Sequence, residues 1–429
     1  MALPKIKQDA LDARLAVTTV PAGAAWAQAA RAEAMARVTE MGLPHRRDEY
    51  WRYTDPAALV AAEVIPAALF NDDTAPMFDE IARVKVVFVD GVFDAAASDD
   101  LALEGISIER LADVQNVDGH WAASLFGVLE ARGQNPVARP LAALNTASAT
   151  DGLVIRVSAK VEKPVNLIYK HTSETSDAVL HHVIKVEDGA VLTLLENGPG
   201  AARFSSVTEV EVGEGAEFHH VRAQGRDHER RALTHTFARI HAEGVFKSLT
   251  MTANGRLVRN ECIMEIVGDN ASAHVAGIAM GDGPDFVQDD TVFITHDAVG
   301  CESRQVFKKV LRNAATGVFQ GKILVKQGAQ KTDGYQISQS LLLDDDAVFL
   351  AKPELEIYAD DVKCSHGSTS GAIDDTALFY LRSRGVPLAE AQNLLVLAFV
   401  AEALDEIADE RLADDLRGRL EGWLARRQG

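Results

Sequence analysis

The sequence contains little cysteine, few aromatic residues and no long apolar run. Its three cysteines, Cys262, Cys301 and Cys364, are too few for a disulfide framework, and no two have the CxxC spacing of a metal clip. Aromatic residues are only 6% of the 429 residues. The most apolar stretch, residues 394–401, is far shorter than the ~20 residues that a membrane-spanning helix needs. These absences exclude a disulfide-stapled domain and predict no membrane helix.

Positive charge is also scarce. Lys and Arg total 43 against 63 Asp and Glu, which gives a formal net charge of −20. Because this charge repels a phosphate backbone and an anionic bilayer, we expect neither nucleic-acid nor membrane-surface binding. Charged residues interrupt the opening segment MALPKIKQDALDARLA, so no signal peptide is expected. The sequence therefore predicts a reduced, cytoplasmic protein.

Several signatures of catalysis are missing. The sequence has no GxxxxGK[ST] phosphate loop, so we expect no ATP hydrolysis and no intrinsic nucleotide site. It also lacks a GxGxxG that opens a helix after a strand, an HExxH and a GxSxG elbow. Nothing in these patterns predicts an enzyme.

The first 149 residues divide into a helical region, 1–60, and a mixed connecting region, 61–149. A four-residue apolar repeat predicts a helix that stops at Gly42 and Pro44, and its members are Trp26, Ala30, Ala34 and Val38. Two-residue alternation from residue 84 predicts a strand, and Asp90-Gly91 suits the type I′ turn of a hairpin that ends near residue 93.

Residues 150–372 read as a long β-rich core. Short β-type runs recur from residues 153–157 to residues 355–358, and almost no helical pattern separates them. Small turn residues divide the runs at intervals of 26, 29, 26 and 30 residues, at Gly189, Gly215, Gly244, Asn270 and Gly300. This loose period, in which no sharp consensus repeats, resembles that of a solenoid. The fold predicted is mainly β, with a parallel β-helix between helical ends.

The helical period returns in residues 373–429. Pro387 suits the first turn of a helix, and a leucine stripe follows at Leu412, Leu416, Leu420 and Leu424. Residues 388–404 are apolar on more than one face, so they cannot bury all their side chains in one core. We expect this surplus to be covered by the β core or offered to a partner.

Candidate site residues are few. The adjacent pairs His181-His182 and His219-His220 lie in predicted strands, where neighbours point to opposite faces, so neither pair can chelate one metal. The acidic runs 344–346 and 360–361 suit solvated turns, although paired carboxylates also occur in sugar-cleaving β-helical enzymes.

One constellation, DDVKCSHG at residues 360–367, has the chemistry of a metal site. Cys364 and His366 are two residues apart, so an extended chain near a strand end at the surface puts both on one face. A thiolate and an imidazole suit iron, zinc or Cu(I). Two ligands do not complete a site, so a second chain or a cluster would supply the rest. The alternative is a small buried cysteine beside a surface histidine.

Several segments resemble the SufB/SufD family of iron–sulfur cluster assembly proteins, and its SufD branch most. They are KTDGYQ (331–336), SLLL (340–343), PELEI (353–357), ADDVKCSHGSTSG (359–371) and LFYLRSRGVPLAEA (378–391). LPHRRDEYWRYTD (43–55), VVFVDGVF (86–93) and LAALNTASATDG (141–152) are similar to the same family. The resemblance touches nearly the whole chain.

This resemblance implies a right-handed parallel β-helix and a non-catalytic scaffold subunit. Such a subunit pairs with SufB through the β-helix edge, carries the ATPase SufC on its C-terminal helical domain, and works in the cytosol. A homodimer in the absence of SufB is the other pairing. His366 matches the SufD histidine at the site where a transient iron–sulfur cluster forms, shared with SufB, which has glutamate there. The resemblance leaves Cys364 open between a cluster ligand and a packing residue.

Two further alternatives stay open. A stand-alone β-helical carbohydrate-active enzyme would be expected to carry an export signal and a cleft lined with carboxylates and aromatic residues. The sequence shows no export signal and few aromatic residues. A purely structural brace differs from the scaffold only in whether Cys364 and His366 touch iron.

Overall fold

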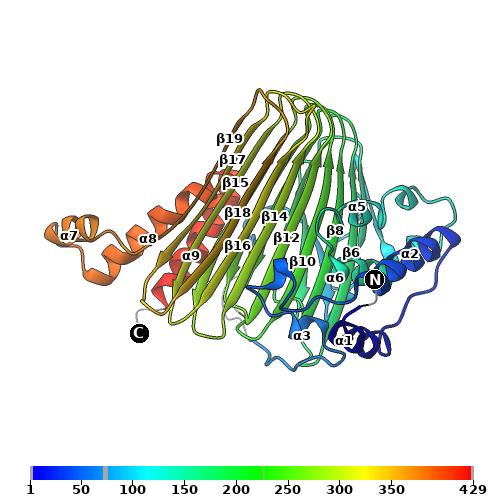
Figure 1. Ribbon diagram of the computed structural model, residues 1–429, viewed down its shortest axis with the longest axis horizontal. Helices are drawn as coiled ribbons and strands as arrows, with labels where there is room; N and C mark the ends of the chain where they lie inside the picture. The colour runs from blue at the N-terminus through cyan, green and yellow to red at the C-terminus, as the bar shows by residue number, and fades with distance from the viewer. Residues whose placement is uncertain (1–2, 71–75, 226, 427–429) are drawn as a thin grey trace.

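The computed structural model describes residues 3–70, 76–225 and 227–426 (Figure 1). Along the chain, helices precede and follow a long series of stacked strands. The N-terminal part contains α1 (Lys5–Leu15), α2 (Ala25–Met41), η1 (Glu49–Trp51), α3 (Ala57–Val60), α4 (Leu111–Val114), η2 (Trp121–Ser124), α5 (Val128–Arg132) and α6 (Pro140–Ser148). The C-terminal part contains α7 (Asp375–Ser383), α8 (Leu388–Leu404) and α9 (Glu410–Ala425).

The strands of the described residues form two sheets. The first, in spatial order, is β19 (Lys363–Gly371), β17 (Asp333–Leu342), β15 (Glu302–Arg312), β13 (Ser272–Asp282), β11 (Val245–Ala253), β9 (Glu217–Gln224), β7 (Val191–Gly198), β5 (Val165–Lys170), β1 (Val84–Val89) and β2 (Val92–Phe93). The second is β18 (Val348–Ile357), β16 (Thr316–Val325), β14 (Val287–His296), β12 (Leu257–Ile266), β10 (Arg231–Ile240), β8 (Arg203–Val212), β6 (Asp177–Val186), β4 (Leu153–Val157) and β3 (Ile106–Arg110).

Successive strands from β4 onward alternate between the sheets and pair in parallel with the strand two places along. Arg231 pairs with Leu257 one coil later, and Glu302 pairs with Asp333. The chain therefore winds as a solenoid with one strand of each sheet per coil, which confirms the predicted parallel β-helix. Every β-type run in the predicted series lies in or overlaps one of these strands, whereas β13, β17 and β19 were not in that series.

Left-handed backbone conformations mark the predicted turns. Gly189, Gly215, Asn270 and Gly300 all have φ between 58° and 70°. At the fifth turn the positive φ belongs to Glu243 (57°) instead of its neighbour Gly244. Repeated turns of this kind return the chain to the same edge of the solenoid in each coil.

The connecting region supplies the first strands of both sheets. Asp90 (φ 50°) and Gly91 (φ 84°) form the predicted hairpin turn between antiparallel β1 and β2. β1 also pairs in parallel with β5, while β3 pairs antiparallel with β4. Both sheets therefore extend beyond residue 150 toward the N-terminus.

The interior of the solenoid is mostly apolar but contains a buried polar column. Tyr169 donates a hydrogen bond to Glu196 (2.8 Å), and Arg222 donates to the same carboxylate (2.7 Å). Arg222 also donates to Thr234 (2.8 Å) in the facing sheet. Burial opposes ionisation of Glu196, but Arg222 and His220 outweigh it and hold the pKa of this carboxyl well below its usual value. These bonds fix the register of coils that an apolar interior alone would leave less well defined.

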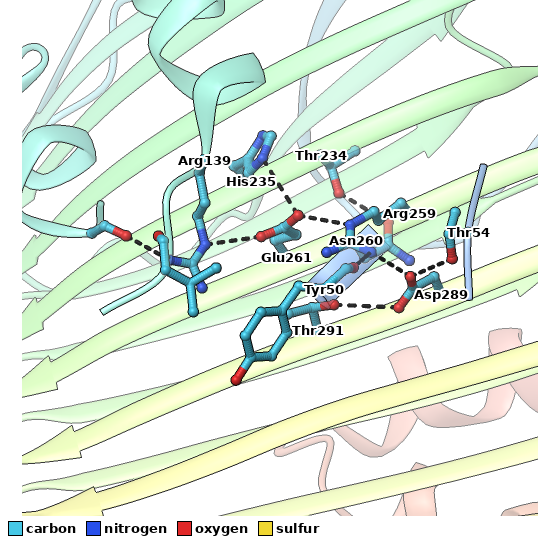
Figure 2. A network of polar contacts seen from close by, with 12 residues as sticks. Tyr50, Thr54, Arg139, Thr234, His235, Arg259, Asn260, Glu261, Asp289 and Thr291 are labelled. Atoms are coloured by element: carbon cyan, nitrogen blue, oxygen red, sulfur yellow. Dashed lines mark hydrogen bonds and ion pairs between the residues drawn. The ribbon is translucent and has the colours of Figure 1, made fainter. Parts of the chain in front are cut away.

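A second buried network ties the N-terminal segments to the outer face of the nine-stranded sheet (Figure 2). Arg259 donates to Glu261 (2.7 Å) and to Asp289 (2.5 Å). Arg139, from the loop before α6, donates to the other oxygen of Glu261 (2.9 Å), and Thr54 donates to Asp289 (2.5 Å). The outer face of this sheet is thus the docking surface of the N-terminal helices.

Helices α8 and α9 pack on the outer face of the ten-stranded sheet. All four leucines of the predicted stripe in α9 are buried there, in an apolar cluster with Val400 of α8 and residues of β9, β11, β13 and β15. Glu406, two residues after the end of α8, accepts a hydrogen bond from Arg304 (3.0 Å) and pairs with His274 (2.9 Å). Within the described residues, no helix has the length and apolarity to cross a membrane.

Candidate functional site at the open end of the solenoid

The last coil of the solenoid consists of β18 and β19. Each pairs with only one strand, β18 with β16 and β19 with β17, so each is the edge of its sheet among the described residues (Figure 1). β18 contains most of the last predicted β-type run, residues 355–358, and it ends at Ile357. One side of this coil therefore keeps unpaired backbone N–H and C=O groups.

Cys364 and His366 both lie on β19. His366 is the fourth of nine residues, so it lies within the strand and not at the strand end that we expected. Cys364 pairs with Gly334 of β17, and His366 pairs with Gln336. Gly334 and Gln336 are buried inside the solenoid, and a side chain on β19 continues the column of its pairing partner. Both candidate residues thus belong to the inward-facing side of the last coil.

Cys364 is half-buried against apolar side chains. Its neighbours in this cluster include Ile323, Leu355 and Val362. Burial raises the pKa of the Cys364 thiol; Asp333 adds to the shift, and a backbone hydrogen bond from Gly334 opposes it. The thiol therefore stays protonated at neutral pH unless a metal displaces the proton.

His366 is exposed, although its partner one coil earlier is completely buried. Gln336 is 0% exposed and donates a hydrogen bond to Gln305 (2.8 Å), but its Oε1 has no hydrogen-bond partner among the described residues. Within the same part of the chain the His366 imidazole makes no hydrogen bond or ion pair. Both ring nitrogens are therefore free for a metal, a proton or a partner chain.

Two serines continue the same inward column. Ser368 and Ser370 bond to Ser338 and Ser340 of the preceding coil, each at an Oγ–Oγ distance of 3.0 Å. Our sequence analysis missed both serines and Gln336. The signal was present, because serines at the same two-residue spacing recur 30 residues apart.

Cys364 and His366 do not form a complete metal site by themselves. The described residues contain no group of three or more His, Cys, Asp or Glu side chains arranged to hold a metal ion. The pair still has suitable chemistry, because a thiolate and an imidazole are both iron ligands. A cluster bound here would need further ligands besides these two side chains.

The other candidates have structural roles. His182 contacts Tyr169 inside the solenoid, whereas His181 pairs with Glu209 (2.9 Å) on the outer face, so adjacent histidines point to opposite sides as predicted. Asp344 accepts a hydrogen bond from the backbone N–H of Asn313 (2.9 Å), and Asp361 pairs with Lys331, which is turn chemistry.

α7 projects from the solenoid immediately after β19 (Figure 1). None of its residues is buried, and Phe379 (73% exposed) and Tyr380 (57%) present their rings to solvent. In α8, Val396 and Val400 are buried while Leu394 is 44% exposed. The apolar surplus predicted for this region is therefore partly covered by the β core and partly open.

Comparisons with known proteins agree over nearly the full length. The family model described as the SUF system FeS cluster assembly, SufBD core domain, matches residues 169–399, and the model of the SufBD protein N-terminal region matches residues 21–167. The iron–sulfur cluster assembly protein SufD of Escherichia coli is 28% identical, over 88% of this chain and 89% of its own.

Other relatives have the same assignment. An iron–sulfur cluster assembly SufBD family protein of Synechocystis is 28% identical over 87% of this chain and 86% of its own. SufD of Bacillus subtilis is 29% identical over 64% and 65%. Because the core-domain match alone covers more than half of the chain, the chain belongs to the SufBD family of iron–sulfur cluster assembly proteins and is similar to SufD.

Proposed function

We propose that this chain is a non-catalytic scaffold subunit of a cytosolic SufBCD complex, in which an iron–sulfur cluster is built between this chain and SufB. One observation carries the proposal. The inward column of the solenoid ends at an exposed His366 that has no partner within the described residues, beside the half-buried thiol of Cys364. Such a pair is half of a metal site, and a second chain is the natural source of the other half.

The edge strands supply the means of pairing. A second β-helix can add its own strands to β18 and β19 by main-chain hydrogen bonds. The inward side chains of β18 include Leu355 and Ile357, and Ile357 is 39% exposed. Pairing would cover these apolar groups and would enclose His366 and Cys364 between two chains.

The cluster is cargo in this proposal. His366 can ligate iron through either ring nitrogen or accept a proton as sulfide or thiol is incorporated. The raised pKa of Cys364 means that its thiol loses its proton only when metal binds. The remaining ligands come from SufB, and the cluster passes on to another protein.

The C-terminal helices are the proposed site for SufC. The exposed rings of α7 and the open side of α8 form an apolar surface of the kind that a partner covers. α7 follows β19 after three residues. The ATPase would thus bind next to the strand that bears His366.

Co-expression with SufB and SufC from the same source tests the proposal. The chain should co-purify with both proteins, and the complex should acquire the visible absorbance of an iron–sulfur cluster when iron, cysteine and a desulfurase are supplied. Ile357→Lys on the edge of β18 should abolish SufB capture while SufC capture persists. Full SufB binding by this variant, or a chain that stays monomeric and binds neither partner, would refute the pairing.

A further inference from the structure

A basic pocket lies among the N-terminal helices. These helices lie at the end of the molecule opposite to α7 (Figure 1). Its volume is about 710 Å³, and its walls come from α1, from the loop after α2 and from the start of α3. This volume is within the ~300–1,000 Å³ of small-molecule sites. Its loop belongs to the segment LPHRRDEYWRYTD, for which the proposed scaffold function has no use.

The charge of this pocket is opposite to that of the chain. Four cations line it, Lys7, Arg46, Arg47 and Arg52, against one carboxylate, Asp55. Lys7 is already paired with Asp48 (2.7 Å) outside the lining. Across residues 3–70, 76–225 and 227–426, the three guanidinium groups make no ion pair or side-chain hydrogen bond. Three exposed arginines without an ion-pair partner therefore line one cavity, beside a single carboxylate, in a protein whose net charge is −20.

The loop that carries these arginines is held in place by the solenoid. Arg259 donates a hydrogen bond to the Tyr50 carbonyl (2.8 Å), and its guanidinium lies over the ring of buried Trp51 at 4.1 Å. The backbone N–H of His45 donates to Asp48 (3.0 Å). The backbone on both sides of the arginines is therefore anchored before any ligand arrives, which lowers the entropic cost of binding.

The pocket also has an apolar wall. Buried Leu43 lines it, together with Ile6 (55% exposed) and Val60. A ligand that has both a charged group and an apolar or aromatic group would use both walls.

We propose that this pocket binds a small organic molecule with a multiply charged phosphate group. Guanidinium groups match phosphate oxygens in bidentate geometry, and three of them balance a diphosphate. The organic part lies against Ile6, Leu43 and Val60. No phosphate loop is required, because arginine side chains supply the donors, and no hydrolysis is implied. The proposal is independent of the role in cluster assembly.

Calorimetric titration of the full chain tests this site with two probes, sodium pyrophosphate and ADP, both without Mg²⁺. Each should bind saturably with one site per chain. Arg46→Ala, Arg47→Ala and Arg52→Ala should each weaken binding about tenfold or more, since each removes a charge-assisted hydrogen bond. Arg382→Ala on α7 is the matched control, because it removes the same charge far from the pocket and should leave affinity unchanged. Circular dichroism of each variant confirms that it is folded.

The second probe tests the apolar wall. ADP should bind at least as tightly as pyrophosphate, and Ile6→Ser should weaken ADP more than pyrophosphate. Weaker binding of ADP than of pyrophosphate overturns the assignment to an organic phosphate. If Arg382→Ala weakens binding as much as the pocket variants do, the attraction is general and the site is refuted. If neither probe binds saturably, the site is also refuted. Arginine-dependent binding of a polyglutamate peptide without binding of either phosphate would assign the pocket to a protein partner and refute the proposal.

Discussion

His366 and Gln336 are pairing partners on adjacent parallel strands, yet only Gln336 is buried. The two side chains occupy the same inward column, one coil apart. The difference between them is that no further coil of the described residues stacks on β19. A residue type that can bind metal thus occupies an exposed position in the last coil of this inward column.

His366→Ala should abolish or strongly reduce cluster formation and leave the fold intact. The imidazole has no partner within the described residues, so its removal should change the free energy of unfolding by no more than roughly 0.5 kcal/mol. The variant should still assemble with SufB and SufC, and visible absorbance of the purified complex reports the cluster. Ser365→Ala, its exposed neighbour on the other face of β19, is the control and should build clusters normally.

Either of two results would contradict this site. Clusters that form on the His366→Ala complex at the parent rate would make this subunit only a brace. A variant that unfolds or no longer binds SufB would show that His366 is structural.

Substitution of Cys364 should have a milder effect than that of His366. Cys364→Ser places a hydroxyl among apolar neighbours and should cost about 1–2 kcal/mol of unfolding free energy. Cys364→Val keeps an apolar side chain of similar size and should restore stability. If Cys364 only packs, cluster yield should follow stability in these two variants. A stable Cys364→Val complex without clusters would instead identify Cys364 as a ligand.

The sequence predicts the fold correctly where local residue patterns determine the structure. Left-handed residues such as Asn270 and Gly300 recur once per coil, and β-branched runs fill most strands between them. β13 was not predicted as a strand, because packing against the next coil determines its residues. A Cβ at Gly277 would lie 2.5 Å from the ring of Phe307, so only glycine fits there. Such a long-range constraint lowers the β-propensity of the strand, so the local sequence does not indicate a strand there.

The candidate site was readable only in part. The two-residue spacing put Cys364 and His366 on one face, but it could not say whether that face was inside or outside the solenoid. Exposure of an inward column arises only where the stack of coils ends, which is a property of the topology. The Gln336 Oε1 without a hydrogen-bond partner among the described residues and the Ser338–Ser368 hydrogen bond depend on the same stacking.

Phe379→Ser on α7 should weaken SufC binding more than tenfold without changing the stability of the chain. A hot-spot residue at the centre of an interface contributes about 2 kcal/mol or more to binding, and aromatic residues are frequent among hot spots. Deletion from Pro387 onward is a poorer test, because it would uncover the apolar cluster that α9 buries on the solenoid. Val92→Ser, another exposed apolar position (68%), is the control in a SufC capture assay. If both variants capture SufC equally well, SufC does not bind at Phe379.

Glu261→Gln should be strongly destabilising. Glu261 accepts hydrogen bonds from Arg259 and Arg139, whose side chains are each 1% exposed. Loss of its charge leaves two buried cations undercompensated, which costs about 3–5 kcal/mol. Glu265→Gln on the same strand removes an exposed pair with Arg132 and should cost less than about 1 kcal/mol. Urea unfolding at pH 7 compares the two variants, and equal midpoints would show that the network in Figure 2 does not anchor the N-terminal helices.

Mild acid should destabilise the chain through its buried histidines. Burial lowers the pKa values of His182, His235 and His296 to about 4, with only partial opposition from carboxylates near the first two. An unfolded histidine titrates near ~6.5, so between about pH 6.5 and pH 4 the unfolded chain takes up protons that the folded chain does not. Stability is therefore full above pH 6.5 and falls as the pH decreases through this window.

The pKa of the Glu261 carboxyl is lowered to about 2. The contribution of its charge to stability is therefore lost only below pH ~4.5, the usual pKa of a glutamate. The urea midpoint should accordingly fall between pH 7 and pH 5. His296→Gln, which keeps a polar group beside Ser303 but cannot titrate, should reduce that fall. A midpoint that is constant from pH 7 to pH 5, or a fall of the same size in His296→Gln, would show that the buried histidines do not set the acid limit of the fold.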